Sequence, residues 1–284
     1  SHAEIIDGNS IPDASRAIEN QHYYPNQVLK VFLKNDGASK ILSEIKKALS
    51  SFKHIKIVQE ERDYDLLLRE HAGHIITEVG DPTEISPRIL TSNANVIKDT
   101  VKQVTQWGKW FNVLNIKNNN PQLNIKFNIE TPSKTEEILE GTEFNITIKN
   151  NSKQRLYLAL IDLSSDGQIG LVFPKKGGKD FIAPGHTVKK RLRANLPDKV
   201  NSIRDVLKII ATTDPTNYHF LEQQPVGNSS LSKNIRGYQN MLSHFEELIA
   251  NAAIGTTRGQ TVAKKSLNPG NWVTLERTIK IIRR

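Results

Sequence analysis

The 284-residue chain contains no cysteine, a single methionine and only 6% aromatic residues. Without cysteine there can be no disulfide, no thiolate metal site and no cysteine nucleophile within it. No apolar run approaches the roughly 18 residues that a membrane-spanning helix requires. We expect no membrane partner and an aliphatic core. We also expect a cytoplasmic protein, although the lack of cysteine suits reducing and oxidising surroundings alike.

Sequence motifs for catalysis are also missing. There is no HExxH metalloprotease helix and no GxSxG nucleophile elbow. His71 and His74 are separated by Gly73, which favours a turn over a shared metal-ligand face. The GGKD at 177–180 lacks the Ser or Thr that follows the lysine of a phosphate-binding loop, since Asp180 stands there. We predict no catalytic residue, no metal site and no cofactor.

The most structured stretch is LYLALIDLSSDGQIGLVFP, residues 156–174. Two apolar runs flank Asp166-Gly167, a strong hairpin signal because glycine takes the positive φ that such turns require. The first run, 156–163, is apolar on both alternating faces, which predicts a central strand covered on both sides. Asp162 interrupts it, so this carboxylate either faces solvent near a strand end or is buried against a base.

The N-terminal part divides into a linker and a small α/β domain. Residues 1–26 are polar and aperiodic, and we interpret them as a linker from an upstream domain. Residues 27–120 form the predicted domain, which ends in a long connecting helix over 96–114 with bulky aromatics in its last turns. The other predicted elements are strands at 28–33, 54–58, 64–68 and 74–79 and a helix over 38–52. The aromatics predict a helix clamped between two layers.

Residues 121–284 form the second predicted domain, a β-sandwich with a C-terminal helix and strand. The predicted helix covers 238–252, and 181–185 is predicted as a turn. The predicted strands lie at 123–129, 144–148, 156–163, 169–173, 188–192, 206–212 and 272–282. We expect the last strand to pair back and place both ends of the domain in one sheet. The predicted fold class is α+β, a small α/β domain followed by an immunoglobulin-like β-sandwich with the appended helix and strand.

The net charge of +9 comes entirely from residues 121–284, because residues 1–120 carry 15 basic and 15 acidic side chains. Much of the excess is concentrated in one candidate interaction patch: Lys175, Lys176, Lys179, Lys189, Lys190, Arg191 and Arg193. Such a patch could attract an acidic protein surface or nucleic acid. The alternative is a solvated strand edge whose lysines prevent aggregation.

Four segments give the chain a resemblance to a known region. They are Asp166-Gly167, Phe173-Pro174, Pro184-Gly185 and the run Lys208-Ile209-Ile210-Ala211-Thr212. With them the chain resembles the C-terminal non-catalytic region, an immunoglobulin-like domain of unknown function, of bacterial caspase-like cysteine peptidases (the metacaspase and orthocaspase group). The resemblance implies that the catalytic His-Cys dyad belongs to an upstream peptidase domain, and that no residue of this chain inherits that role.

Two functions follow as expectations. The first is a non-catalytic accessory, regulatory or protein-binding module of a caspase-like protease, with the peptidase domain or its protein substrate as partner. The second is a free-standing adaptor that uses the basic face to bind an acidic protein or, on weaker grounds, nucleic acid. In both, this chain is not itself an enzyme. A third alternative, an independent hydrolase, depends only on Asp162 and the histidines.

Overall fold

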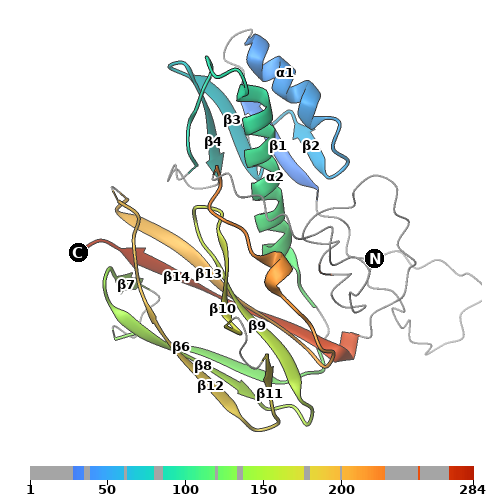
Figure 1. Ribbon diagram of the computed structural model, residues 1–284, viewed down its shortest axis with the longest axis vertical. Helices are drawn as coiled ribbons and strands as arrows, with labels where there is room; N and C mark the ends of the chain where they lie inside the picture. The colour runs from blue at the N-terminus through green and yellow to red at the C-terminus, as the bar shows by residue number, and fades with distance from the viewer. Residues whose placement is uncertain are drawn as a thin grey trace, which may run out of the picture.

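The computed structural model describes residues 28–34, 39–60, 63–79, 86–118, 121–132, 137–175, 180–198, 200–227, 249 and 269–284. Figure 1 shows an N-terminal layer of sheet and helix above a β-rich half, with one long helix running down from the N-terminal layer to the β-rich half. The fold is mixed α+β, as the sequence predicts at this level.

The N-terminal layer is a five-stranded mixed sheet of order β2-β1-β3-β4-β5. Its central β1 runs parallel to β2 and β3, whereas β3, β4 and β5 are successively antiparallel. The strands are β1 (Leu29–Lys34), β2 (Ile55–Val58), β3 (Leu66–His71), β4 (His74–Val79) and β5 (Ile89–Leu90). Four of them lie where alternating apolar residues predict strands, while β5 was not predicted because two residues carry no period.

Two helices accompany this sheet. Helix α1 (Lys40–Leu49) begins after Ser39, whose hydroxyl accepts a hydrogen bond from the Leu42 amide. It is shorter than the predicted 38–52. Helix α2 (Val96–Asn115) matches the predicted long helix to within one residue. Its aromatic turns, with Trp107 and Trp110, are buried.

The β half consists of two sheets that share a second core. The larger has the order β10-β9-β13-β14-β7, with β11 also paired to β9, and the smaller has the order β12-β8-β6. The strands are β6 (Ile125–Glu130), β7 (Glu137–Leu139), β8 (Glu143–Asn150), β9 (Leu156–Leu163), β10 (Ile169–Phe173), β11 (Phe181–Ile182), β12 (Thr187–Arg193), β13 (Ser202–Thr212) and β14 (Trp272–Ile282). A short 3-10 turn, η1 (His219–Leu221), lies between β13 and β14 in sequence, and η2 (Pro269–Asn271) precedes β14.

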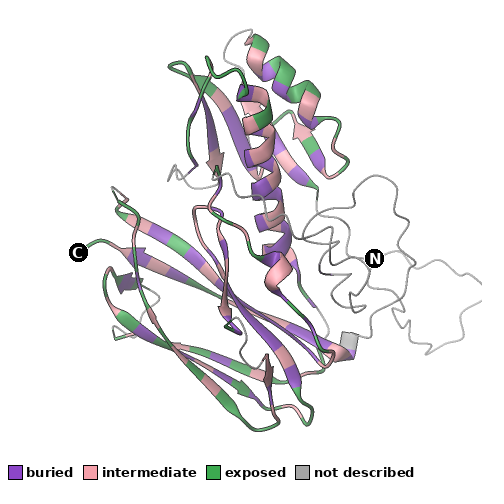
Figure 2. Ribbon diagram, viewed as in Figure 1, coloured by how far each residue is buried: buried purple, intermediate pink, exposed green. Residues whose placement is uncertain are grey.

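Strand β9 is central and covered on both faces, which confirms the prediction. Leu156, Leu158 and Leu160 lie in the core between the two sheets of the β half. Ala159 and Ile161, on the other face, lie in the core that contains α2. The two-sided burial is visible in Figure 2 as nearly continuous purple along the middle of the larger sheet.

Two details of the predicted β half are wrong. Phe181–Ile182 is strand β11, paired with Tyr157 and Leu156, and only Ala183-Pro184-Gly185 turns. The final strand does pair back, along all of β13, but the first strand of this half, β6, lies in the other sheet. The two ends of the unit therefore lie in different sheets. A two-residue strand gives no alternation to detect, and strand pairing between distant segments leaves no local sequence signal.

Helix α2 lies between the N-terminal sheet and the larger sheet of the β half, as its aromatics predict. One core cluster contains residues of β1, α1 and α2 together with Ile161 of β9 and Ile210 of β13. Hydrogen bonds also cross this boundary between the N-terminal layer and the β half, which we call the seam. The Lys109 ammonium donates to the carbonyls of Phe220 and Glu222 (3.2 and 3.1 Å), and the Gln223 side chain donates to the Gln106 carbonyl (3.1 Å).

Lys208 of β13 anchors the end of the helix. Its side chain is fully buried, and its ammonium donates to the Leu114 carbonyl at 2.6 Å and to the Glu276 carboxylate at 3.4 Å. The last carbonyls of a helix have no partner within the helix, so a cation there satisfies both the hydrogen bond and the helix dipole. Burial lowers the pKa of Lys208 to about 8.

Within the described residues, no helix is long and apolar enough to cross a membrane. The predicted linker at 1–26 lies outside those residues. So does the predicted helix at 238–252, apart from Ile249, which is buried in the core that contains α2.

Candidate functional site

The three-stranded sheet of the β half turns an entirely polar face to solvent. Along β6, β8 and β12 the alternate residues Phe127, Ile146 and Val188 point into the core, so the remaining residues point outward. The outward residues, which we call the cationic face, are Lys126, Asn128, Glu130, Glu143, Asn145, Thr147, Lys149, Thr187, Lys189, Arg191 and Arg193. Five cations and two carboxylates give this face a net positive charge.

The predicted patch is divided by the pleat of β12. Lys189, Arg191 and Arg193 lie on the cationic face, and Arg191 pairs with Glu143 at 3.4 Å. Lys190 points to the opposite side, where its ammonium lies 5.1 Å from the centre of the Phe173 ring. Lys175 is exposed next to Pro174, after β10. Lys176 and Lys179 lie outside the described residues.

Two cations of the face, Lys126 and Lys149, were not among the predicted patch residues. They lie on β6 and β8 and face each other across the ladder. Lys149 is also opposite Thr187 of β12. The signal for them was present in the sequence, because both occupy polar positions in alternating strands, but only the strand pairing brings them beside β12.

Strand β12 forms one edge of its sheet among the described strands. At its two ends, Ala194 exchanges backbone hydrogen bonds with Gly141 and Thr142, and the His186 carbonyl accepts one from the Asn150 amide, all on the β8 side. In an antiparallel strand the direction of these bonds alternates. The amide and carbonyl groups of Lys189, Arg191 and Arg193 therefore point to the open edge. The cations of this face lie directly beside a row of backbone donors and acceptors that have no strand partner among the described residues.

A second feature is an acid pair at the open end of the β half. Asp162 of β9 and Asp205 of β13 line a cavity of about 400 Å3 between the two sheets, together with Asp166 and Arg193. Asp205 is buried and accepts a hydrogen bond from the Ser165 amide at 2.9 Å. Asp162 Oδ1 is buried without a hydrogen-bond partner among the described residues.

Burial, together with the charges of neighbouring acids, raises the pKa of both acids. The pKa of Asp162 rises to about 7, first through desolvation and then through the charges of Asp205 and Asp166. The pKa of Asp205 rises to about 6, mainly through desolvation. Asp162 therefore matches neither sequence-based alternative, because it is partly buried beside other acids rather than against a base. The pair can hold and exchange a proton near neutral pH.

The groups that such a proton would serve are not found around the pair. No histidine lines the cavity, and across the described part of the chain no three His, Asp or Glu side chains gather as a metal site. The acids thus lower stability at neutral pH, and among the described residues that line the cavity they are accompanied by the hydroxyls of Ser164 and Ser165 but by no histidine. Comparison of the sequence with protein families and with curated proteins finds no family model and no relative that matches.

Proposed function

We propose that this chain is a non-catalytic, protein-binding accessory module, built on an immunoglobulin-like sandwich, of a bacterial caspase-like protease. Its partner is the peptidase domain or a protein substrate, and it binds an extended acidic segment at β12. The observation that carries the proposal is the coincidence of the cationic face with the open edge of that strand.

Strand geometry supports an extended protein segment. Alternate residues of a strand recur every 6.4–6.8 Å or so on one face. An extended peptide that adds to β12 repeats its own side chains with the same spacing, so alternating acids would each face one of Lys189, Arg191 and Arg193. Backbone hydrogen bonds to the free edge would supply affinity, and the charges would supply register and selectivity.

Nucleic acid is the less favoured partner because the cationic face lacks aromatic side chains. Proteins that bind single strands combine cations with aromatic side chains on which bases stack. None of the eleven residues of the cationic face is aromatic. Binding to phosphates alone would therefore be non-specific and steeply salt-dependent. This reading corresponds to the adaptor alternative, and the experiment below includes it.

The test measures fluorescence anisotropy with three labelled probes: an alternating Glu-Thr octapeptide, its Lys-Thr counterpart and a 20-base-pair DNA duplex. The key variant carries Lys189→Glu, Arg191→Glu and Arg193→Glu. The control carries Lys46→Glu, Lys53→Glu and Lys56→Glu, exposed lysines of the N-terminal layer with the same charge change. We expect the Glu-Thr peptide to bind, and the key variant to weaken it at least about tenfold more than the control does.

Three results would contradict the proposal. One is equal loss in the two triple variants, which would reduce the effect to net charge. Another is tighter binding of the duplex than of the Glu-Thr peptide, which would favour the nucleic-acid adaptor. The third is no binding of any probe, which would leave the lysines as protection of a strand edge against aggregation.

A further inference from the structure

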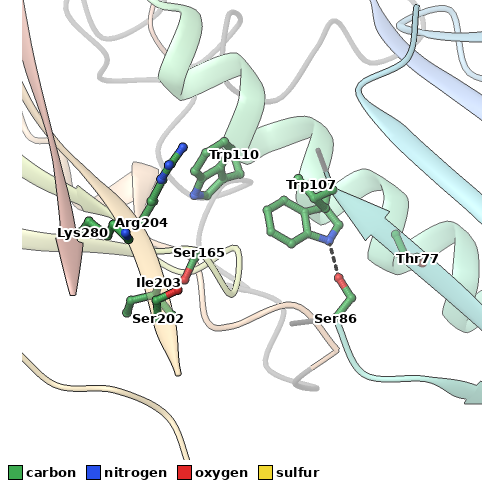
Figure 3. A pocket seen from close by; sticks show the side chains of 10 residues that line it. Thr77, Ser86, Trp107, Trp110, Ser165, Ser202, Ile203, Arg204 and Lys280 are labelled. Carbon is green, nitrogen blue, oxygen red and sulfur yellow. Dashed lines mark hydrogen bonds between the residues drawn. The ribbon is translucent and has the colours of Figure 1, made fainter. Parts of the chain in front are cut away.

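A separate cavity of about 380 Å3 lies in the seam between the N-terminal layer and the larger sheet of the β half (Figure 3). Trp107 and Trp110 of α2 form its apolar wall, and Arg204 of β13 and Lys280 of β14 lie on the opposite side. The hydroxyls of Ser86 and Ser165 also line it. Its size falls in the range of about 300–1,000 Å3 that small-molecule sites occupy.

The two indoles differ in how their N–H groups are satisfied. Trp107 donates to the Ser86 hydroxyl at 2.9 Å, and Figure 3 shows this bond as a dashed line. Trp110 is 8% exposed, and its Nε1 is buried with no acceptor among the described residues. Figure 3 shows this nitrogen turned toward the side of the cavity where Arg204 and Ser165 lie. A buried donor left without an acceptor is costly, so an acceptor supplied by a ligand would be favourable there.

The charged residues that line the cavity are both cations. Arg204 and Lys280 are cross-strand partners on β13 and β14, and no carboxylate is among the described residues that line the cavity. The Lys280 ammonium donates to Glu137 at 2.7 Å. Arg204 is exposed, and its guanidinium has no ion-pair partner among the described residues. A planar guanidinium with free donors matches the geometry of a carboxylate.

We propose that this seam cavity binds a small monocarboxylate with an aromatic or aliphatic body. The carboxylate receives hydrogen bonds from Arg204 and from the Trp110 N–H, and the body packs against the two indole rings. Both halves of the protein contribute to the site, so a bound ligand also stabilises the seam along α2. The site lies on the opposite side of the β half from the cationic face and does not depend on the proposed protein partner.

The experiment titrates the chain with 4-phenylbutyrate and with hexanoate, and follows tryptophan fluorescence and heat of binding. The matched neutral probe is 4-phenylbutanol, which keeps the body and lacks the charge. We expect saturable carboxylate binding with a dissociation constant of about 1 mM or tighter. We expect the wild-type chain to bind 4-phenylbutanol at least about tenfold more weakly than 4-phenylbutyrate. We expect Arg204→Met to bind both carboxylates at least about tenfold more weakly than the wild-type chain does. Trp110→Phe keeps the ring, loses the N–H and should weaken both carboxylates several-fold.

The outcomes against the proposal are distinct. The absence of a saturable signal for either carboxylate up to ~10 mM in the wild-type chain would overturn it. So would equal affinity for 4-phenylbutyrate and 4-phenylbutanol, or unchanged affinity in Arg204→Met. Thermal unfolding of each variant establishes that it is folded, and Arg204 is exposed, so its replacement leaves the core intact. Lys189→Met should bind as the wild type does, which separates this site from the cationic face.

Discussion

Replacing Asp162 with asparagine should make the protein more stable at neutral and alkaline pH. The carboxyl binds its proton more tightly in the folded chain, where burial raises its pKa to about 7, than in the unfolded chain, where its pKa has the ordinary value of 3.8. Its contribution to stability is therefore fully present below about pH 3.8 and is lost as the pH rises to about 7. Asparagine has the same shape and no charge, so the variant should not lose this contribution.

The size of the effect follows from the same shift. A change from 3.8 to about 7 corresponds to a ceiling of roughly 4 kcal/mol at 1.36 kcal/mol per pH unit. Asp162 is only partly buried, and it titrates together with Asp205, so we discount the ceiling. We expect Asp162→Asn to be about 1–2 kcal/mol more stable than the wild type near pH 8 and about equal to it near pH 4.

Urea unfolding followed by tryptophan fluorescence between about pH 4 and pH 8 measures this difference. Asp198→Asn is the control, because Asp198 is exposed. Ionisable groups that do not interact with Asp162 cancel when the two are compared, while Asp205, which titrates together with Asp162, is part of the measured difference. The reasoning is refuted if the Asp162→Asn advantage does not grow with pH, or if Asp198→Asn shows the same growth.

Two further substitutions test the seam. Gly167 has a φ of +79°, and an added Cβ would lie 2.4 Å from Val226 Cγ2, whereas Gly185 has a φ of +74° and nothing within 4 Å. We expect Gly167→Ala to lower the free energy of unfolding by about 2–4 kcal/mol and Gly185→Ala by about 1 kcal/mol, measured by urea unfolding; equal losses would contradict the steric argument. Lys208→Ala should lower the free energy of unfolding by about 2–4 kcal/mol, because it leaves a cavity and removes the hydrogen bond to the Leu114 carbonyl. Lys208→Met should recover most of this loss. A Met variant as unstable as the Ala variant would show that the charge, and not the packing, matters.

The periodic elements could be predicted from sequence because a single surface decides them. Alternation located β1, β8 and β14, and the 3.6-residue period located α2, since each has one face in a core. The apolar composition of both faces of β9 even predicted a second layer over it. Strands of two or three residues, such as β11, were missed because no period exists over that length.

What the sequence could not supply is which strands become neighbours. Lys190 and Lys189 are adjacent in sequence but lie on opposite faces, and this alternation was available in principle once β12 was predicted as a strand. The pairing of β9 with β13, by contrast, brings Asp162 and Asp205 together from positions 43 residues apart. No local sequence pattern indicates that two distant strands will pair, so the sequence did not predict that these two acids lie side by side. The same holds for the cross-strand pair of Arg204 and Lys280.

Both faces of the larger sheet are covered by other parts of the chain, and this explains where its charged residues lie. One face packs on the three-stranded sheet of β6, β8 and β12, and the other packs on α2, so β9 and β13 are buried over most of their length. Charged residues of β9 and β13 lie near the strand ends, as Asp162 and Arg204 do, or are enclosed with a partner, as Lys208 of β13 is with Glu276 of β14. Lys208 is explained by the helix end that it caps. Asp162 and the Trp110 N–H, which has no acceptor in the described part of the chain, have no such explanation in the fold. Buried polar groups that lower stability are typical of sites selected for something other than stability. At the Trp110 cavity the N–H and the Arg204 guanidinium would both favour an anion, whereas Arg193 already lines the cavity of the acid pair, and for that reason the ligand is proposed at the Trp110 cavity.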